Sequence, residues 1–501
     1  VLTSCDSMWR GVEVWGNRNH SQEYDPTIHG YWQGRLLMNG STIENSINGV
    51  DLWRPNAMGN TGGIISAYNS TFRNNAKAIH ACYYVVKPNM LPNSINYDNK
   101  SIVNNCTFVI DNDYLGEVVF HKHIDLAGVK GFKFVGCDFS TVRTSMISPY
   151  ATGIAAYEAG VFVDARKLYS SQGIYLGLDK STFTGFYSGV YGTTVNLKNF
   201  KESVVIDNTN FIDNANGVRI VNFLGSVITR STFNLGLNYG DMNKCSTLYG
   251  SSFGVDLSGC SEFRVEENSF NGGTGGINYD FNGVKVNNCP SLADIVYKNS
   301  FSNLMRGNYA KGINRADATD PYGVSYECNI FNTNRLDFYV DTFAIIGTRQ
   351  GQYIMEYNVK KYIASGNVLT SPNFSGLLAQ FRNDNFKSII DYYQWQPNSN
   401  EILSVIDGLG ASSVDVHNAD YANTCLSKLS NPNSNTNNLG SITDVLVVTK
   451  EEAYSLEQAY LEAESNHSIV SNLLRSLTDG GSTEETVNSI EMSNSSQTME
   501  L

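Results

Sequence analysis

An internal repeat is the feature of this sequence that most restricts how the chain can fold. A Phe or Ile follows a stretch rich in Ser, Thr and Asn, and a Gly-Val pair or a close variant begins six residues later. The copies of this pattern begin at Ile43, Phe72, Phe183, Phe211, Phe270 and Phe301. The full series of repeated phenylalanines is Phe72, Phe108, Phe139, Phe183, Phe211, Phe233, Phe270, Phe301 and Phe331. Self-similarity of this kind is typical of chains in which each repeat forms one structural unit that stacks on the next.

The spacing of the repeat varies while its motif stays constant. Successive phenylalanines are separated by 22 to 44 residues, so the excess length lies in loops that leave the common unit. Residues 123–139 align with residues 254–270 without a gap, and residues 283–289 repeat the opening of that unit. Within each unit, short segments with alternating apolar residues are separated by Gly, Asn and Asp. This pattern is typical of β-strands joined by turns.

These units predict an all-β chain wound as a right-handed parallel β-helix of about ten coils. One coil of three short strands cannot bury its inward residues by itself. A second coil stacked above it pairs backbone N–H and C=O groups in parallel at a spacing of ~4.8 Å and covers the inward Phe, Ile, Val and Leu. An antiparallel sandwich is the alternative fold, but it does not explain why equivalent residues return in every unit.

The sequence divides into four segments. We expect the β-helix over residues 1–343. An irregular aromatic segment at 344–404 should cap the last coil, because an open end would expose apolar residues and unpaired strand groups. An Asn- and Ser-rich linker is expected over 405–448. Residues 449–501 carry apolar residues at helical spacing and predict a short helical segment, which we interpret as the incomplete beginning of a larger region.

Composition narrows the class of partner. The 501 residues carry a net charge of -13, and the pI is near 5.0. This balance argues against a nucleic-acid partner, because binding phosphates needs an excess of Lys and Arg. No apolar run is long enough for a membrane-spanning helix. None of the nine cysteines stands in a CxxC pair, so the sequence predicts neither a zinc nor a redox site, and we expect these cysteines to be small buried core residues.

The residue after each Gly-Val pair should point outward, because side chains alternate along a strand. These residues form a column of candidate binding residues, namely Asp51, His80, Tyr191, Arg219 and Asn278. Their polar and mutually different side chains fit either an ordinary solvated surface or one wall of a shallow groove for a polymer. Asp256 and Lys285 occupy the same repeat position one coil apart, which predicts a surface ion pair between them.

Polar clusters elsewhere supply candidates for catalysis on polysaccharides. A lyase of the pectate type needs carboxylates that hold Ca²⁺ and an Arg or Lys that takes a proton, whereas a glycoside hydrolase needs two carboxylates beside the sugar bond. The candidate catalytic residues are His123, Asp125, Asp164, Arg166 and Lys167. Solvated charge or a turn explains each of them with fewer assumptions, and no recognised catalytic signature or metal-binding motif accompanies them. Ca²⁺ enters the prediction only if the chain is a lyase; otherwise no cofactor is expected.

Several segments resemble a known class of proteins. Residues 5–16 (CDSMWRGVEVWG), 62–65 (GGII), 106–108 (CTF) and 479–483 (DGGST) are similar to segments of large secreted β-helix proteins of Bacteroidota. The resemblance implies a pectin-lyase-like fold, export as cargo of a type IX secretion system, and a location at the cell surface or outside the cell. It does not imply lyase activity, because the shared motifs are structural.

Two classes of function remain open. The first is a non-catalytic extracellular protein: a surface scaffold, adhesin or glycan-binding stalk. Its partners would be the secretion machinery and a polysaccharide or cell-surface glycan. The second is a carbohydrate-active enzyme, a polysaccharide lyase or glycoside hydrolase, working in a groove along the coils. The fold supports the enzyme by analogy, as do exposed aromatic residues that could stack on sugars. A phage tailspike uses the same fold as well, but nothing in the sequence marks a trimer interface.

Overall fold

The computed structural model describes most of the chain up to residue 429. The described residues are 1–429 except 5, 23–24, 26–27, 55–56, 85–98, 143–145, 171–174, 196–202, 236–250, 292–293 and 317–321. The predicted helical segment 449–501 lies outside the described residues, as do residues 430–448 of the predicted linker. None of the helices in the described part of the chain has the length and apolar character needed to cross a membrane.

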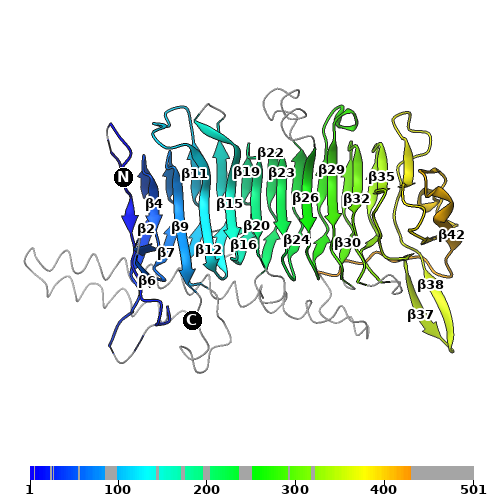
Figure 1. Ribbon diagram of the computed structural model, residues 1–501, viewed down its shortest axis with the longest axis horizontal. Helices are drawn as coiled ribbons and strands as arrows, with labels where there is room; N and C mark the ends of the chain where they lie inside the picture. The colour runs from blue at the N-terminus through cyan, green and yellow to red at the C-terminus, as the bar shows by residue number, and fades with distance from the viewer. Residues whose placement is uncertain are drawn as a thin grey trace, which may run out of the picture. The chain divides into compact units, whose positions relative to one another are not determined.

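The first sheet has thirteen strands and runs along the whole stack of coils (Figure 1). Its strands are Val12–Glu13 (β1), Asn48–Asp51 (β4), Lys77–Tyr84 (β9), Phe120–Val129 (β12), Ile147–Tyr157 (β15), Ser188–Thr193 (β20), Asn216–Val221 (β23), Ser252–Ser258 (β26), Phe281–Asn287 (β29), Arg306–Lys311 (β32), Leu336–Val340 (β35), Ala379–Asn383 (β39) and Ile406–Asp407 (β41). Successive strands of this sheet come from successive coils, so the order in the sheet follows the order along the chain.

Two further sheets of ten strands each complete the coils. The second sheet contains Arg35–Asn39 (β2), Ile64–Tyr68 (β7), Ile102–Asn104 (β10), Phe132–Val135 (β13), Val161–Asp164 (β16), Val204–Asp207 (β21), Val227–Thr229 (β24), Arg264–Glu266 (β27), Ile295–Tyr297 (β30) and Ser325–Glu327 (β33). The third contains Thr42–Glu44 (β3), Thr71–Arg73 (β8), Thr107–Ile110 (β11), Asp138–Thr141 (β14), Thr182–Thr184 (β19), Asn210–Asn214 (β22), Thr232–Leu235 (β25), Ser269–Asn271 (β28), Ser300–Ser302 (β31) and Ile330–Asn332 (β34).

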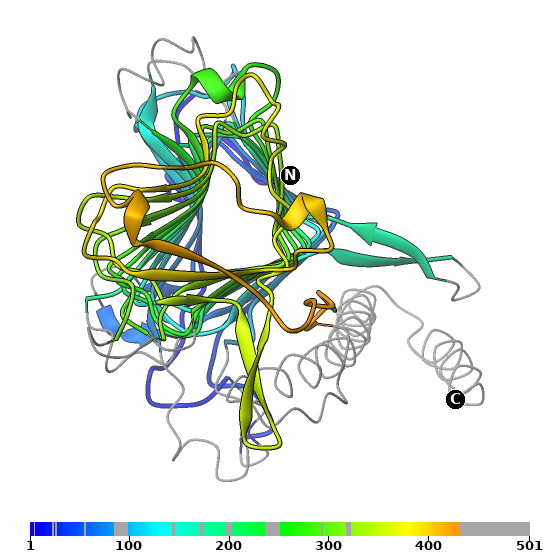
Figure 2. The same ribbon diagram turned by 90° about the vertical axis from the view of Figure 1, so that its right-hand side faces the viewer.

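Each complete coil contributes one strand to each of these sheets. Strands from successive coils pair in parallel throughout the three sheets, and the view from the C-terminal end shows the three sides of the coil (Figure 2). The predicted parallel β-helix is therefore confirmed. Shorter elements leave the coils: the antiparallel pairs β5–β6 (Trp53–Arg54, Ala57–Thr61) and β17–β18 (Arg166–Tyr169, Tyr175–Asp179), and the 3-10 turn η2 (Gly276–Asn278).

A continuous column of phenylalanine rings fills the interior beside the third sheet. From Phe72 to Phe331, each ring stacks on the ring of the next coil, with centroids 4.5 to 5.2 Å apart and ring planes within 12° of parallel. All nine rings are buried. Phe183 pairs in register with Phe211, and Phe211 with Phe233. The repeated Phe of the sequence is thus the inward residue that each coil stacks on its neighbour.

The glycine of the Gly-Val pair makes room for this column. A Cβ atom on Gly217 would lie 2.5 Å from the ring of Phe233, and a Cβ on Gly189 would lie 2.7 Å from the ring of Phe211. The same close approach recurs at Gly254 and Gly283 in the following coils. Each glycine therefore accommodates the Phe of the next coil, which explains why the two residues recur together.

Polar ladders satisfy the backbone at one turn of the coils. In the later coils, Asn268, Asn299, Asn329 and Asn367 accept a hydrogen bond through Oδ1 from the backbone N–H of the preceding coil and donate through Nδ2 to a carbonyl of that coil. Cys137 holds the equivalent place in an earlier coil, where its thiol donates to a carbonyl of the coil before. This placement explains a buried cysteine at a repeated position.

The C-terminal end of the solenoid is more regular than predicted. The first sheet continues past residue 343 through β39 and β41, and a small parallel sheet forms from Arg349–Gln350 (β36), Ile390–Gln394 (β40) and Val414–Asn418 (β42). Two single 3-10 turns, η3 (Ser399–Glu401) and η4 (Ala411–Ser413), lie between these strands. The buried ring of Tyr392 packs against Phe338 and Phe381.

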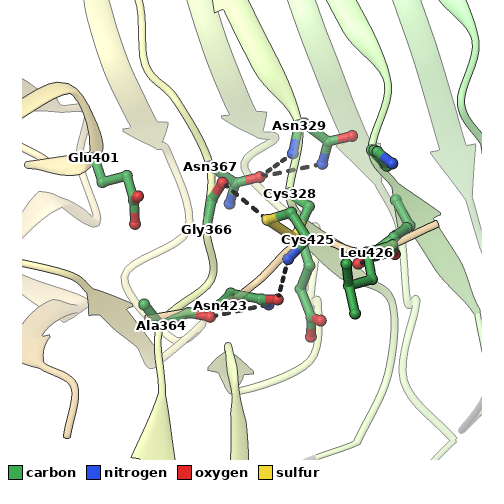
Figure 3. The surroundings of a disulfide bond; sticks show 12 residues. Cys328, Asn329, Ala364, Gly366, Asn367, Glu401, Asn423, Cys425 and Leu426 are labelled. Atoms are coloured by element: carbon green, nitrogen blue, oxygen red, sulfur yellow. Dashed lines mark hydrogen bonds between the residues drawn. A yellow bond between two sulfur atoms is a disulfide. The ribbon is translucent and has the colours of Figure 1, made fainter. Parts of the chain in front are cut away.

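A disulfide joins Cys328 to Cys425 across 97 residues of sequence (Figure 3). It ties the chain that follows β42 to the coil containing β33. Cys425 also donates its N–H to the side chain of Asn423, which in turn donates to the carbonyl of Ala364. The expectation of small buried core residues holds for Cys328 and for the five free cysteines Cys82, Cys106, Cys137, Cys260 and Cys289, whereas Cys425 is only partly buried and reaches Cys328 from the cap. Cys5 and Cys245 lie outside the described residues.

Two buried carboxyl groups stand inside the solenoid. Burial raises the pKa of Asp294 to about 8 and that of Asp337 to about 7. Asp337 accepts hydrogen bonds from the hydroxyl and the N–H of Thr370, at 2.6 and 2.8 Å. Because each folded-state pKa lies above the unfolded-state value, the folded chain holds a proton that the unfolded chain has already released at intermediate pH.

We predict that Gly217→Ala lowers the free energy of unfolding by about 1 to 3 kcal/mol, because the new methyl group overlaps the ring of Phe233. Gly59→Ala is the matched control, since a Cβ there meets no atom within 4 Å, and it should change stability by less than about 0.5 kcal/mol. Urea unfolding followed by circular dichroism measures both variants. Equal effects of the two substitutions would contradict the proposed packing role of the repeated glycine.

We also predict that the Asp337 side chain makes the protein lose stability as pH rises. Its stabilising contribution is fully present below the unfolded-state pKa of about 3.9 and is lost as pH rises through about 7. Asp337→Asn cannot titrate, so between pH 5 and pH 8.5 the variant should gain more than about 1 kcal/mol relative to the unsubstituted chain. Urea midpoints measured across this range give the difference, and a difference that stays constant with pH would refute the assignment.

Candidate functional site

One outward residue from each strand of the first sheet, which in most coils follows an inward Val or Ile, belongs to a continuous column that we call the outer column. In order along the stack, it consists of Glu13, Asp51, His80, Asp125, Ala155, Tyr191, Arg219, Asp256, Lys285, Tyr309, Tyr339, Arg382 and Asp407. Parallel pairing in register places these residues directly above one another. Four of the five predicted binding residues, Asp51, His80, Tyr191 and Arg219, lie on this column.

The prediction for Asn278 is wrong. The Gly-Ile pair before it belongs to η2, outside the three sheets. The coil resumes only at β29, where Gly283 meets the ring of Phe301 and Lys285 takes the outward position. A loop inserted after Phe270 therefore moved the true Gly-Val pair seven residues along the chain, from 276 to 283.

Polar and charged groups at the N-terminal part of the outer column pair with one another. The His80 Nδ1 atom lies 2.9 Å from a carboxylate oxygen of Asp51. The carboxylate of Asp125, one coil further on, contacts Lys77 at 3.2 Å and Lys122 at 3.0 Å. Burial alone would raise the pKa of Asp125, but the two lysines outweigh it and hold that pKa below its usual value. The Asp125 carboxylate is therefore ionised, and its oxygens are paired with the ammonium groups of Lys77 and Lys122.

The middle of the outer column repeats this arrangement. Asp256 lies between two cations, with Arg219 at 3.6 Å in the coil before and Lys285 at 3.1 Å in the coil after. The side chain of Asp256 is only 6% exposed. The ion pair predicted between Asp256 and Lys285 is thus confirmed, and it takes the carboxylate out of contact with solvent.

Tyrosines gather between these two charged groups. The rings of Tyr150 and Tyr187 meet edge to face at 5.1 Å, and those of Tyr157 and Tyr191 do so at 6.1 Å. We call these four residues the tyrosine patch. The ammonium group of Lys122 lies 4.8 Å from the ring centre of Tyr157 at one side, and Arg219 lies over Tyr191 at 5.9 Å on the other. Tyr150 and Tyr157 are 58% and 40% exposed.

The C-terminal part of the outer column combines aromatic rings and charge once more. The guanidinium group of Arg306 lies 5.1 Å from the ring centres of both Tyr309 and Tyr339. The Tyr309 hydroxyl donates to Asp341 at 2.9 Å. Arg382, at the next outer position, pairs with Asp407 at 3.2 Å. Cations and rings therefore alternate along much of this face of the solenoid.

The candidate catalytic residues do not come together. His123 is 1% exposed and lies inside, at the position that Gly153 takes in the next coil. Burial lowers its pKa to about 4, so the ring is neutral and packs among phenylalanines. A proton donor or acceptor for a substrate must reach the surface, and His123 does not.

The remaining candidates lie on separate elements. Asp164 ends β16, where its carboxylate accepts a hydrogen bond from the N–H of Ala165. Arg166 belongs to β17 and pairs with Asp179 across the β17–β18 hairpin at 2.8 Å. Lys167 is exposed on the same hairpin. Of the five, only Asp125 stands on the outer column.

No metal site is evident in the part of the chain that the structure describes. Within it, no group of three or more His, Cys, Asp or Glu side chains lies close enough to hold a metal ion. The carboxylates of Asp125, Asp256 and Asp407 are each engaged by Lys or Arg. Oxygen ligands for Ca²⁺ need several free carboxylate or carbonyl oxygens around one point, and these residues do not fit that need.

Sequence reasoning missed the tyrosine patch except for Tyr191. Tyr150 and Tyr157 both lie on β15, the longest strand of the first sheet, and Tyr187 comes immediately before β20. The sequence does contain a signal for this patch. Tyr150 and Tyr157 stand seven residues apart in one strand region, and Tyr187 and Tyr191 stand four residues apart in the next. Of these four tyrosines, only Tyr191 follows a Gly-Val pair, the position at which the repeat predicts an outward side chain.

Comparison of the chain with models of known protein families, with curated proteins and with solved structures finds no match.

We predict that Lys285→Met lowers the free energy of unfolding by about 1 to 3 kcal/mol, because it leaves the buried carboxylate of Asp256 with one distant cation. Lys361→Met is the matched control. Lys361 pairs with Asp420 at 3.1 Å, but both side chains are about one-third exposed, so its loss should cost less than about 1 kcal/mol. Urea unfolding of both variants tests this difference, and similar losses would show that the outer ion pairs act as ordinary surface charges.

Proposed function

We propose that this chain is a non-catalytic extracellular scaffold that binds a glycan at the tyrosine patch on the outer face of the first sheet. The observation that carries the proposal is the combination of exposed rings with carboxylates already neutralised by neighbouring cations. Exposed aromatic rings offer flat apolar faces with a polar rim, which suits the faces and hydroxyls of sugar rings. Rigid strands hold Tyr150 and Tyr157 at fixed spacing.

The charge pairing favours binding over catalysis. A glycoside hydrolase needs two carboxyl groups beside the sugar bond, one to donate a proton and one to accept or attack. A lyase needs a basic group ready to take a proton. Asp125 and Asp256 each face two cations, and those cations are occupied in turn. Groups held in such pairs are poor bases and poor nucleophiles.

The disulfide supports the extracellular part of the proposal. Cys328–Cys425 is a bond of the kind that persists in oxidising surroundings and is rare in reducing ones. The segments that resemble secreted β-helix proteins of Bacteroidota point the same way. We therefore extend the proposal to export as secretion-system cargo, with the cell surface or the external medium as destination.

We predict that the purified chain binds at least one member of a polysaccharide panel, measured by affinity electrophoresis and calorimetry, and releases no reducing or unsaturated ends. Tyr150→Ala combined with Tyr157→Ala should weaken binding by about ten-fold or more, because each ring contributes roughly 0.5 to 1.5 kcal/mol. Tyr357→Ala, on a distant exposed tyrosine, is the control and should leave binding unchanged.

Two outcomes would overturn this proposal. Turnover of any polysaccharide would favour the carbohydrate-active enzyme. Failure to bind any of the panel, or binding that survives loss of both tyrosines, would remove the patch as the ligand site.

A further inference from the structure

A second feature of the surface is the hairpin formed by Gln352–Glu356 (β37) and Val359–Ile363 (β38), which projects from the C-terminal end of the solenoid (Figures 1 and 2). Its strands pair antiparallel and are joined by Tyr357 and Asn358. Both have positive φ, 47° and 64°, as a two-residue turn matching the twist of the strands requires. The hairpin is therefore a well-formed element and not a loose loop.

The hairpin is braced by contacts along its length. The ring of Tyr362 stacks on Tyr393 of β40 at 4.4 Å. Lys361 pairs with Asp420 at 3.1 Å, and the hydroxyl of Tyr421 donates to the carboxylate of Glu356 at 2.7 Å. An isolated two-stranded hairpin is barely stable in water, so these contacts are what holds the tip away from the coils.

The tip of this braced hairpin is apolar. Tyr357 is 95% exposed, and Met355, Val359 and Ile354 are 59%, 55% and 42% exposed. Side chains alternate along each strand, and the register places Val359 opposite Glu356 and Met355 opposite Lys360. Ile354 and Val359 therefore share one face of the hairpin, while Met355 lies on the other. Exposed apolar side chains on both faces of a projecting element mark a contact site.

We propose that this tip inserts into the surface of an anionic lipid bilayer. A protein surface that covered one face would leave the apolar side chains of the other face in water, whereas a lipid interface surrounds the tip from all sides. Tyr is a residue that prefers the interface. Lys360 follows directly after Val359 at the apolar tip, where its ammonium group can meet lipid phosphates while its stem lies against apolar surface. Lys361 is held by Asp420. The carboxylate of Glu356 accepts a hydrogen bond from the hydroxyl of Tyr421.

This inference is independent of glycan binding, because the hairpin and the tyrosine patch lie on different coils.

The test is flotation of the full chain with vesicles of phosphatidylcholine alone and of phosphatidylcholine mixed with phosphatidylglycerol. We expect the chain to float with the mixed vesicles and far less with the neutral ones. Tyr357→Asp combined with Met355→Asp should reduce the bound fraction by about ten-fold, because a charge is costly below the lipid headgroups. Phe343→Asp is the matched control, since Phe343 is 83% exposed but lies outside the hairpin.

Thermal unfolding of the variant shows whether the substitutions disturb the fold, and no change is expected for side chains this exposed. Absence of flotation, equal flotation with neutral vesicles, or an unchanged bound fraction in the tip variant would each overturn the proposal. Sedimentation velocity of the chain without lipid supplies a further check: self-association that the tip variant abolishes would assign the tip to a second copy of the chain instead.

Discussion

The fold depends on the fit between an inward phenylalanine of one coil and a glycine of the coil before it. Backbone hydrogen bonds between neighbouring coils fix the distance between them. These bonds alone do not prevent one strand from shifting by one residue along its neighbour. Sliding by one position would turn the Phe outward and bring a side chain other than glycine against the ring. Because Gly217 faces Phe233, and Gly189 faces Phe211, in the same way, the register is repeated from coil to coil. The outward side chains of the first sheet therefore lie in the same register.

The outer column follows directly from this arrangement. When the inward residues lie above one another, the outward residues one position away must do so as well. Groups such as Arg219, Asp256 and Lys285, more than thirty residues apart in some pairs, thus become neighbours along one line. Ion pairs and ring contacts then form between coils instead of within them, so the same line of residues both stabilises the stack and shapes its surface. The loops of variable length between the strands do not have to place their residues in register with those of the next coil.

Much of the core could be predicted from the sequence, because a solenoid repeats its inward residues. The phenylalanine series gave the interior column directly, and the aligned segments paired Asp256 with Lys285. The same reasoning failed where the repeat was interrupted. Asn278 was misplaced because a loop separates Phe270 from its glycine partner, and His123 was taken for a surface residue although it fills a glycine position among aromatic rings. Features that do not repeat, such as Cys328–Cys425 or the β37–β38 hairpin, leave no periodic signal.

The most direct test of the central claim is a double-mutant cycle on Gly217 and Phe233. Phe233→Ala removes the ring atoms that an added methyl at Gly217 would meet and leaves only its contact with the Gly254 carbonyl, so Gly217→Ala should cost less in the Phe233→Ala background than in the unsubstituted chain. Urea unfolding of the four proteins should give a favourable coupling free energy of about 1 kcal/mol or more. Strictly additive losses would mean that the glycine and the ring do not depend on each other, and the account of how the coils keep their register would fail.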